Sequence, residues 1–311
     1  MAQFLPIRRV IPVELTPCLA SHRLLQLIKS GEWFWNENCH IPCTMTNRES
    51  GYCAESRKWF THFSLRSMTA LHVSRNAAIQ ITDKERNTVA SSIQQFQLGE
   101  GSRGQRLLER GQKFGRERND LMFAAALDIF IKEEQQHSRY LSAFMESQSI
   151  PLLEKHWLDT VFRRQRGLAG LELSLTVLVT AELIAVPYYR ALRGATGSPI
   201  LKLICTRILE DEASHLKFQA FMLARVPVAR PAALRRTLGE LHWLFLLGTI
   251  VVVWFEHREV FQAAGYNFRR FKNETLFEFS DWNTMRCALM KQAGVREKST
   301  MKNFGHVEPE T

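Results

Sequence analysis

The sequence predicts an all-α protein. Long segments of roughly 25 to 40 residues carry apolar side chains at helical spacing, and almost none alternates in the manner of a half-buried strand. Helix start and stop signals separate these segments. Helices of this length joined by short connections pack well as an antiparallel bundle, whose interior offers a place for a metal site.

The first 80 residues show no helical period, so we expect residues 1–80 to form an irregular cap on the bundle. The pattern changes at residue 81. Thr82 is followed three residues later by Glu85, which is the capping-box pattern of a helix start. We therefore expect a first long helix over about 81–115.

The rest of the chain predicts a series of further helices and a polar end. Their expected ranges are about 119–147, 153–194, 198–225, 232–265 and 268–293. The helix at 198–225 has the clearest start, because Ser198 suits the N-cap and Pro199 suits the first turn. Pro187 should kink the helix before it. The tail 294–311 is polar and is expected to be loose.

Composition and charge indicate an ordinary globular protein. The hydrophobic fraction is 45% and the charged fraction 23%. The opening residues lack the apolar core of a secretory signal, and six cysteines are too few for a disulfide scaffold, so we expect a cytoplasmic protein. The net charge of +10 usually indicates a solvated basic surface, and it also favours anionic partners to some extent. No nucleic-acid-binding motif accompanies this charge, so no nucleic acid partner is expected.

The longest apolar run covers residues 241–255. Its 15 residues fall short of the roughly 20 that cross a bilayer, so we expect no transmembrane segment and favour a buried helix. A homodimer interface and a shallow membrane contact are the alternatives, because the run is apolar all round.

The pattern Glu-x-x-His occurs three times, at Glu37–His40, Glu134–His137 and Glu212–His215. Only the last two lie in the middle of expected helices, where residues three apart share a face. An isolated glutamate lies in an apolar or small-residue stretch one helix before each of these two motifs. These glutamates are Glu100 and Glu182, at separations of 134 − 100 = 34 and 212 − 182 = 30 residues.

Four carboxylates and two imidazoles in a helical core require compensation, which two metal ions would provide. Carboxylate and imidazole ligands suit iron or manganese, whereas structural zinc favours thiolates and calcium does not select histidine. A zinc site at Cys39, His40, Cys43 and Cys53 is disfavoured, because no paired Cys-x-x-Cys is present. Gly99 and the neighbouring glycines around Glu100 weaken the first expected helix. Substrate access or close packing of helices at this point would explain why glycines are present.

The order Glu, Glu-x-x-His, Glu, Glu-x-x-His resembles that of the ferritin-like di-iron carboxylate proteins, which include rubrerythrin, bacterial multicomponent monooxygenases and aldehyde-deformylating oxygenase. The resemblance covers residues 81–225 and implies a ferritin-like antiparallel four-helix bundle there. The N-terminal cap and the additional C-terminal helices at 226–293 have no counterpart. By the resemblance, Glu134 and Glu212 bridge the two ions, His137 and His215 each bind one, and Glu100 and Glu182 are terminal ligands.

Four further residues are candidates for the surroundings of the metal ligands. Glu133 and Asp211 directly precede the motif glutamates, and each either orients a ligand histidine or is solvated. Tyr189 returns to the face of Glu182, and Tyr140 follows His137 by about one turn. Either these tyrosines act in proton or electron transfer, or they pack in the core. Core packing is the favoured interpretation for both.

The resemblance implies an oxygenase or oxidase that uses two iron ions, as Fe/Fe or Mn/Fe, and O₂ as co-substrate. The organic substrate would be hydrophobic or tethered to an anionic carrier. The chain has no Cys-x-x-Cys pairs for a rubredoxin-like module, so a ferredoxin or reductase would supply electrons. Ile208 stands where arylamine N-oxygenases have an extra histidine, which favours the six-ligand type. The alternatives are a ferroxidase or peroxide scavenger, a metal-free interaction protein and an RNA-base hydroxylase.

Overall fold

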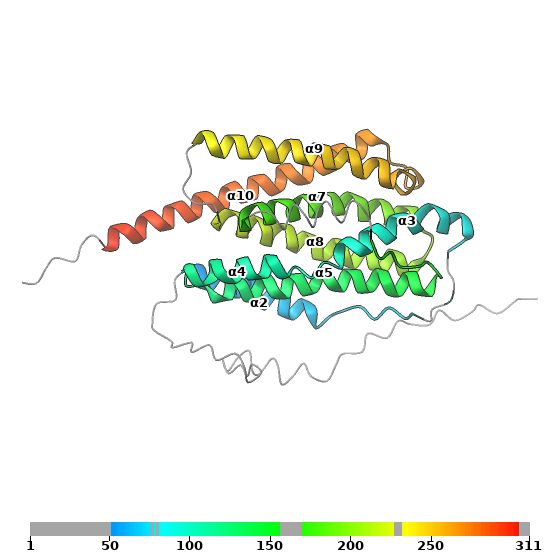
Figure 1. Cartoon of the computed structure of the whole chain (residues 1–311), viewed down its shortest axis with the longest axis horizontal. Coiled ribbons are helices and arrows are strands. Elements are labelled where there is room, and N and C mark those ends of the chain that lie inside the picture. Colours follow the sequence, from blue (N-terminus) through cyan, green and yellow to red (C-terminus); the bar gives the residue numbers. More distant parts are fainter. Residues whose placement is uncertain (1–50, 76–77, 79–80, 156–169, 227–231, 305–311) are drawn as a thin grey trace, which may run out of the picture. The chain divides into compact units, whose positions relative to one another are not determined.

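The computed structural model describes residues 51–75, 78, 81–155, 170–226 and 232–304 (Figure 1). This part of the chain is all-helical and contains no strand, which confirms the predicted class. The helices are α2 (Gly51–Ser67), α3 (Asp83–Glu100), α4 (Gln105–Glu117), α5 (Leu121–Ser147), α7 (Leu171–Ala195), α8 (Pro199–Arg225), α9 (Ala232–Ala263) and α10 (Phe268–Phe304).

The helix expected over 81–115 is instead two helices, α3 and α4. α3 begins as predicted, because the Thr82 hydroxyl accepts a hydrogen bond from the Glu85 backbone N–H. It ends at Glu100, and the chain turns through Gly104, whose φ of +59° is left-handed. A β-carbon at Gly104 would also lie 2.9 Å from Ile131 of α5. The break therefore needs glycine for both its backbone angle and its close contact, which helical spacing alone does not reveal.

Side-chain caps fix the starts of α5 and α8. Ser198 caps α8 as predicted, and α8 ends at Arg225 as expected. Asp120 caps α5 by accepting from the Phe123 backbone N–H. The buried Asp120 carboxylate also accepts hydrogen bonds from Ser56 and lies 2.7 Å from the Arg225 guanidinium. This contact joins α2, α5 and α8.

α2 corrects the expectation of irregular structure over residues 1–80, of which residues 1–50 lie outside the described part. Trp59, Phe60 and Phe63 of this helix pack into one hydrophobic cluster. Phe63 is fully buried and its ring lies 5.8 Å from Trp59 and 5.1 Å from Phe218 of α8. The polar residues between them obscured the helical period.

Two other boundaries differ from expectation. The third expected helix began at residue 153, but residues 151–155 are non-helical, residues 156–169 lie outside the described part, and α7 begins at Leu171. The last helix continues to Phe304, so the tail expected to be loose from residue 294 is helical for most of its length. Helix ends without a strong cap are poorly specified by local sequence.

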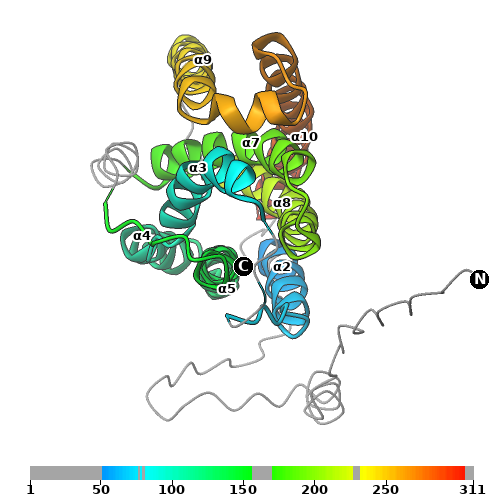
Figure 2. The same ribbon diagram turned by 90° about the vertical axis from the view of Figure 1, so that its right-hand side faces the viewer.

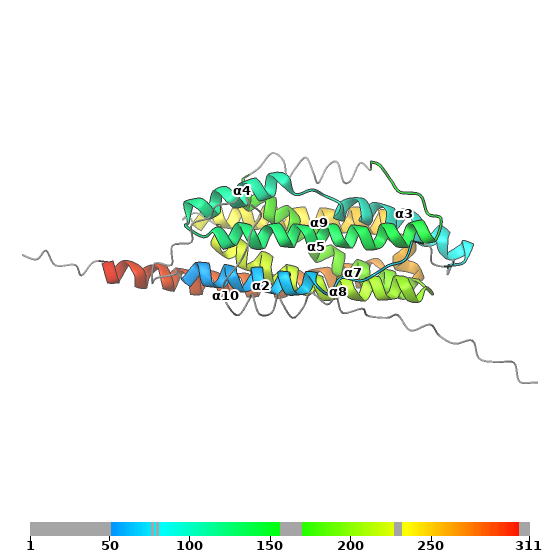
Figure 3. The ribbon, with the colours of Figure 1, turned by 90° about the horizontal axis from the view of Figure 1, so that it is seen from below.

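The helices pack around the residues of the two Glu-x-x-His motifs. α3 packs on α5, α5 on α8, α8 on α7, and α7 on α3. α5 runs alongside both α3 and α4 (Figure 3). α9 and α10 cover the side of α7 that faces away from α5 (Figure 2). The ligand-bearing helices are thus enclosed by further helices on several sides.

Within the described residues, two helices have the length and composition to cross a membrane, Leu171–Ala195 and Arg236–Ala263. The first is mostly buried in the protein. The second belongs to α9, where the sequence favoured a buried helix over residues 241–255. Only one face of this helix is buried, and it includes Leu246, Ile250 and Val253. Its other face exposes a stripe of large apolar side chains: Leu234, Leu238, Leu241, Leu244, Val251 and Phe255.

Candidate metal centre

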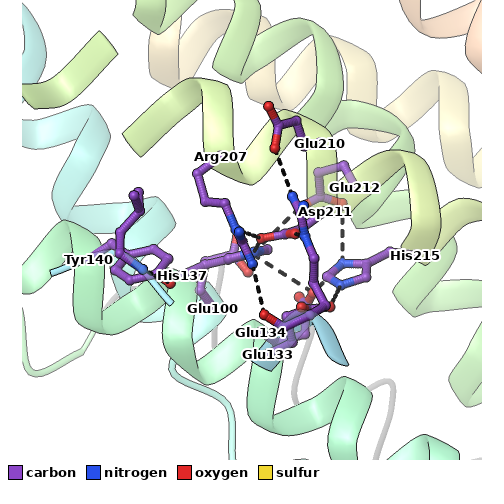
Figure 4. Close-up of polar contacts among 12 residues, drawn as sticks. Glu100, Glu133, Glu134, His137, Tyr140, Arg207, Glu210, Asp211, Glu212 and His215 are labelled. Carbon is purple, nitrogen blue, oxygen red and sulfur yellow. Dashed lines mark hydrogen bonds and ion pairs between the residues drawn. The ribbon is translucent and has the colours of Figure 1, made fainter. Parts of the chain in front are cut away.

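The two mid-helix Glu-x-x-His motifs face each other from α5 and α8 (Figure 4). One ligand atom from each of Glu134, His137, Glu212 and His215 lies within 4.8 Å of the others. His137, Glu212 and His215 are fully buried, and the Glu134 side chain is 13% exposed. Four side chains of metal-ligating type therefore converge in a nearly dry interior.

The inward atoms of this cluster lack hydrogen-bond partners. His215 Nδ1 lies 2.6 Å from Glu134 Oε1, and His137 Nδ1 lies 3.8 Å from Glu212 Oε1. The geometry between these atoms is not that of a hydrogen bond, and all four are buried without a partner. Buried polar atoms are rarely left in this state. Converging nitrogen and oxygen donor atoms are what a metal ion requires, so the residues fit such an ion.

The two isolated glutamates lie beside the motif glutamates. Glu100 ends α3 and accepts a 2.9 Å hydrogen bond from the Tyr189 hydroxyl, and its carboxyl interacts with that of Glu134. Glu182 of α7 is buried, and its carboxyl interacts with that of Glu212. Each half of the cluster thus gains one more carboxylate, as the repeat in the sequence predicts.

The acids that precede the motif glutamates bind the histidines crosswise. Glu133 Oε2 lies 2.9 Å from His215 Nε2, and Asp211 Oδ2 lies 3.2 Å from His137 Nε2. Each acid therefore holds the histidine of the opposite helix. Because a carboxylate only accepts, Nε2 donates to it, so Nδ1 is the ring atom that faces inward and offers its lone pair when the imidazole is neutral. The sequence indicated the orienting role but not the exchange of partners.

Asp211 is in turn held by two arginines. Its carboxylate accepts from Arg66 Nε of α2 at 2.5 Å and from Arg207 Nε at 2.9 Å. Arg66 also contacts Glu210 at 2.8 Å (Figure 4 shows Arg207, Glu210 and Asp211). Neither arginine was predicted from the sequence. Arg207 was detectable, because it lies four residues before Asp211, but Arg66 comes from a helix that was not anticipated.

Other residues singled out in the sequence have different surroundings. Tyr140 accepts a 2.9 Å hydrogen bond from the Leu71 backbone N–H and so fastens the connection between α2 and α3. Gln219, which was missed, donates a 3.0 Å hydrogen bond to Glu182. The sequence did contain a signal for Gln219, because it is a polar residue one turn after His215 within an apolar stretch. The motif at Glu37 and three of the four residues of the disfavoured zinc site, at positions 39, 40 and 43, lie outside the described part.

Burial and repulsion between carboxylates change the proton affinity of the cluster. Burial, followed by the nearby Glu134 charge, raises the pKa of Glu100 to about 8. Burial and the Glu182 charge hold the pKa of Glu212 well above its usual range. Burial alone would lower the pKa of His215, but the Glu134 and Glu133 carboxylates outweigh it and raise that pKa. The His137 pKa is raised in the same way, by Asp211 and Glu134 against burial.

These shifts predict that the metal-free protein loses stability as pH rises from about 5 to 9. All four groups have a folded-state pKa above the unfolded value, so the folded state binds more protons in this window and the free energy of unfolding falls with pH. The opposite contribution of Asp211, whose pKa is held low mainly by His137 and Arg66 against burial, is lost only at lower pH. Urea unfolding across this range checks the slope. Metal loading should make the free energy of unfolding depend less on pH. A metal-free protein that is equally stable at pH 5 and pH 9 would show that the folded state does not bind the extra protons.

Comparison with known protein families, curated proteins and solved structures gives no match. The chemistry of the site is therefore inferred from its own atoms. Two glutamates and two histidines are a donor set for one or two metal ions, and two more carboxylates lie next to them. Oxygen and imidazole nitrogen donors without thiolate suit iron or manganese.

Proposed function

We propose that this protein is a di-iron oxidoreductase that uses O₂ as an oxygenase or oxidase on an organic substrate. The observation that carries the proposal is the pair of crosswise-supported Glu-x-x-His motifs whose inward atoms lack partners. In this proposal α3, α5, α7 and α8 form a ferritin-like antiparallel four-helix bundle. Its ligands are Glu100, Glu134, His137, Glu182, Glu212 and His215, with two irons, or manganese and iron, between them.

The protein's own residues prepare this centre in three ways. Glu133 and Asp211 fix the two imidazoles, so that little reorganisation accompanies metal binding. A hydrogen bond from the Tyr189 hydroxyl restricts rotation of the Glu100 carboxylate. The surrounding helices exclude water from the ligands. The bound iron would supply the electrons that reduce O₂.

The electrons in this proposal come from a separate donor, such as a ferredoxin or a reductase, in the cytoplasm. The net charge of +10 would assist docking of an acidic donor or of an anionic carrier with a tethered substrate. A ferroxidase or peroxide scavenger built on the same ligands is the competing function. An apolar cavity beside the carboxylates favours the oxygenase, because iron oxidation needs no space for an organic molecule.

Successive anaerobic additions of Fe(II), each followed by O₂, test the proposal. We expect oxidation to stop at about two ferric ions per chain when no reductant is added, because an enclosed centre retains its iron. Iron analysis after gel filtration and an oxygen electrode give the two quantities. Glu212→Gln is the control and should leave Fe(II) oxidation at the rate of buffer. Oxidation of many Fe(II) ions per chain would replace the oxygenase by the ferroxidase.

A further inference from the structure

A cavity of about 160 Å³ lies beside the candidate metal centre. Three of the six ligand residues line it, Glu100, Glu134 and Glu182, whereas neither histidine does. The other lining residues come from α3, α4, α5, α7 and α9 and are mostly apolar, including Leu107, Ile131, Leu178, Ala185 and Val253. The cavity therefore meets the centre on its carboxylate side.

α9 closes this cavity although it carries no ligand. Thr249, Val253 and His257 recur every four residues, are all buried and all line the cavity. The Thr249 hydroxyl donates within its own helix, to the carbonyl of Phe245, so this wall of α9 is largely apolar. α9 thus supplies one wall of a chamber whose other walls come from α3, α4, α5 and α7.

One end of the chamber is polar. Gln95 of α3 lines it, and the Gln95 Oε1 atom is buried without a hydrogen-bond partner. His257 lines the same chamber where α9 departs from helical geometry, and its ring packs against Phe96 at 5.1 Å. His257 Nδ1 lies 2.9 Å from the Ser92 hydroxyl. An unpaired buried acceptor costs about 1–3 kcal/mol, which a ligand that donates to it would recover.

Exposed residues line the chamber at Ala181 of α7 and at the break between α3 and α4. Gly99 and Ser102 line it there, and Gly99 is exposed. A β-carbon added at Gly99 would meet no atom within 4 Å. The glycines around Glu100 therefore coincide with an opening, and a larger side chain at Gly99 can be accommodated while it narrows the entrance.

We propose that this chamber binds the substrate, and that the substrate is an apolar molecule or group of about one aromatic ring that carries a hydroxyl or amine donor for Gln95. An apolar cavity of about 150 Å³ holds one benzene molecule, which sets the size. The donor faces Gln95, and the apolar part lies against the walls near the glutamates. This inference rests on the proposed function, because it takes the chamber as the place where that reaction occurs.

Equilibrium binding of phenol and toluene to the anaerobic Fe(II)-loaded protein, by calorimetry, tests the inference. We expect phenol to bind about tenfold more tightly than toluene, the equivalent of one hydrogen bond of about 1.4 kcal/mol. Gln95→Leu should remove the difference. Equal affinities for the two probes in the unaltered protein, or an unchanged preference in Gln95→Leu, would overturn the assignment of the polar end.

Two variants that reduce space test the location. Ala185→Leu, which fills space inside the chamber, should weaken phenol binding at least tenfold, whereas Gly99→Phe, at an opening, should slow the approach of phenol to equilibrium. Leu244→Ala, on the exposed face of α9, is the matched control and should bind normally. Circular dichroism and iron content confirm that each variant is folded and loaded. Undiminished phenol affinity in Ala185→Leu would place the probe elsewhere, and an unchanged rate in Gly99→Phe would place the entrance elsewhere.

The outcomes separate this inference from the proposed function. Selective phenol binding together with oxidation of many Fe(II) ions per chain would leave the chamber in place and remove the oxygenase. Oxidation that stops at two ferric ions per chain without phenol binding would keep the di-iron reaction and overturn the substrate chamber.

Discussion

Glu212→Gln is expected to lose metal binding and yet to stabilise the metal-free protein. Glu212 is fully buried, both of its carboxylate oxygens lack hydrogen-bond partners, and it faces Glu182 and Glu134. Without a metal ion this charge is costly, so a neutral amide of the same shape relieves the repulsion. With a metal ion it is a ligand, and we expect its loss to weaken binding by at least about 100-fold, beyond the effect typical of an outer-shell partner.

The two effects require two measurements on the same variant. Elemental analysis after iron loading should give about two ions per chain for the unaltered protein and close to none for Glu212→Gln. The metal-free variant should melt about 2 °C or more above the metal-free parent, which corresponds to roughly 1 kcal/mol. Glu210→Gln is the matched control, because Glu210 lies on the same helix but is 56% exposed. A metal-free variant less stable than its parent would show that Glu212 has a structural role.

Local chemistry made part of the fold predictable. The starts at Thr82 and Ser198 depend on hydroxyls that cap the adjacent turn, and short-range signals of this kind can be read from the chain. The break at Gly104 was missed, because the need for glycine there depends on the approach of Ile131 from another helix. α2 was missed because only its contact with α8 shows which face of its aromatic sequence is buried.

The candidate site was predictable to the same extent. Its ligands follow from a period within helices, so Glu134, His137, Glu212 and His215 could be named before their convergence was known. Their support could not be derived in full. The exchange of partners between Glu133 and Asp211 depends on how α5 and α8 face each other, which helical spacing does not specify. The unpaired Gln95 and the wall formed by α9 require the packing of helices far apart in the sequence.

Asp211→Ala and Glu133→Ala are expected to differ sharply in stability although their roles at the two histidines match. Asp211 accepts from Arg66 and Arg207 as well as His137, so its removal leaves two guanidinium groups without their buried carboxylate. Removing one partner of such a buried ion pair costs several kcal/mol, and we expect about 3 kcal/mol because Arg66 is partly exposed. Glu133 bonds His215 with one oxygen, and its other oxygen has no partner, so Glu133→Ala leaves one buried N–H without an acceptor and should cost only about 1 kcal/mol.

Metal affinity should respond alike in the two variants, because each leaves one ligand imidazole without the acceptor that fixes its tautomer. Loss of such a partner typically weakens metal binding by about 10- to 100-fold. Chelator competition measures this affinity, and urea unfolding of the metal-free proteins measures stability. Asp211→Asn provides the matched comparison, since its amide oxygen still accepts from His137 while the charge that pairs with the arginines is gone. It should recover metal affinity more than stability. If Glu133→Ala proved as destabilising as Asp211→Ala, the stability cost would come from the histidine contact that the two acids share, and the arginine network would have no special part in it.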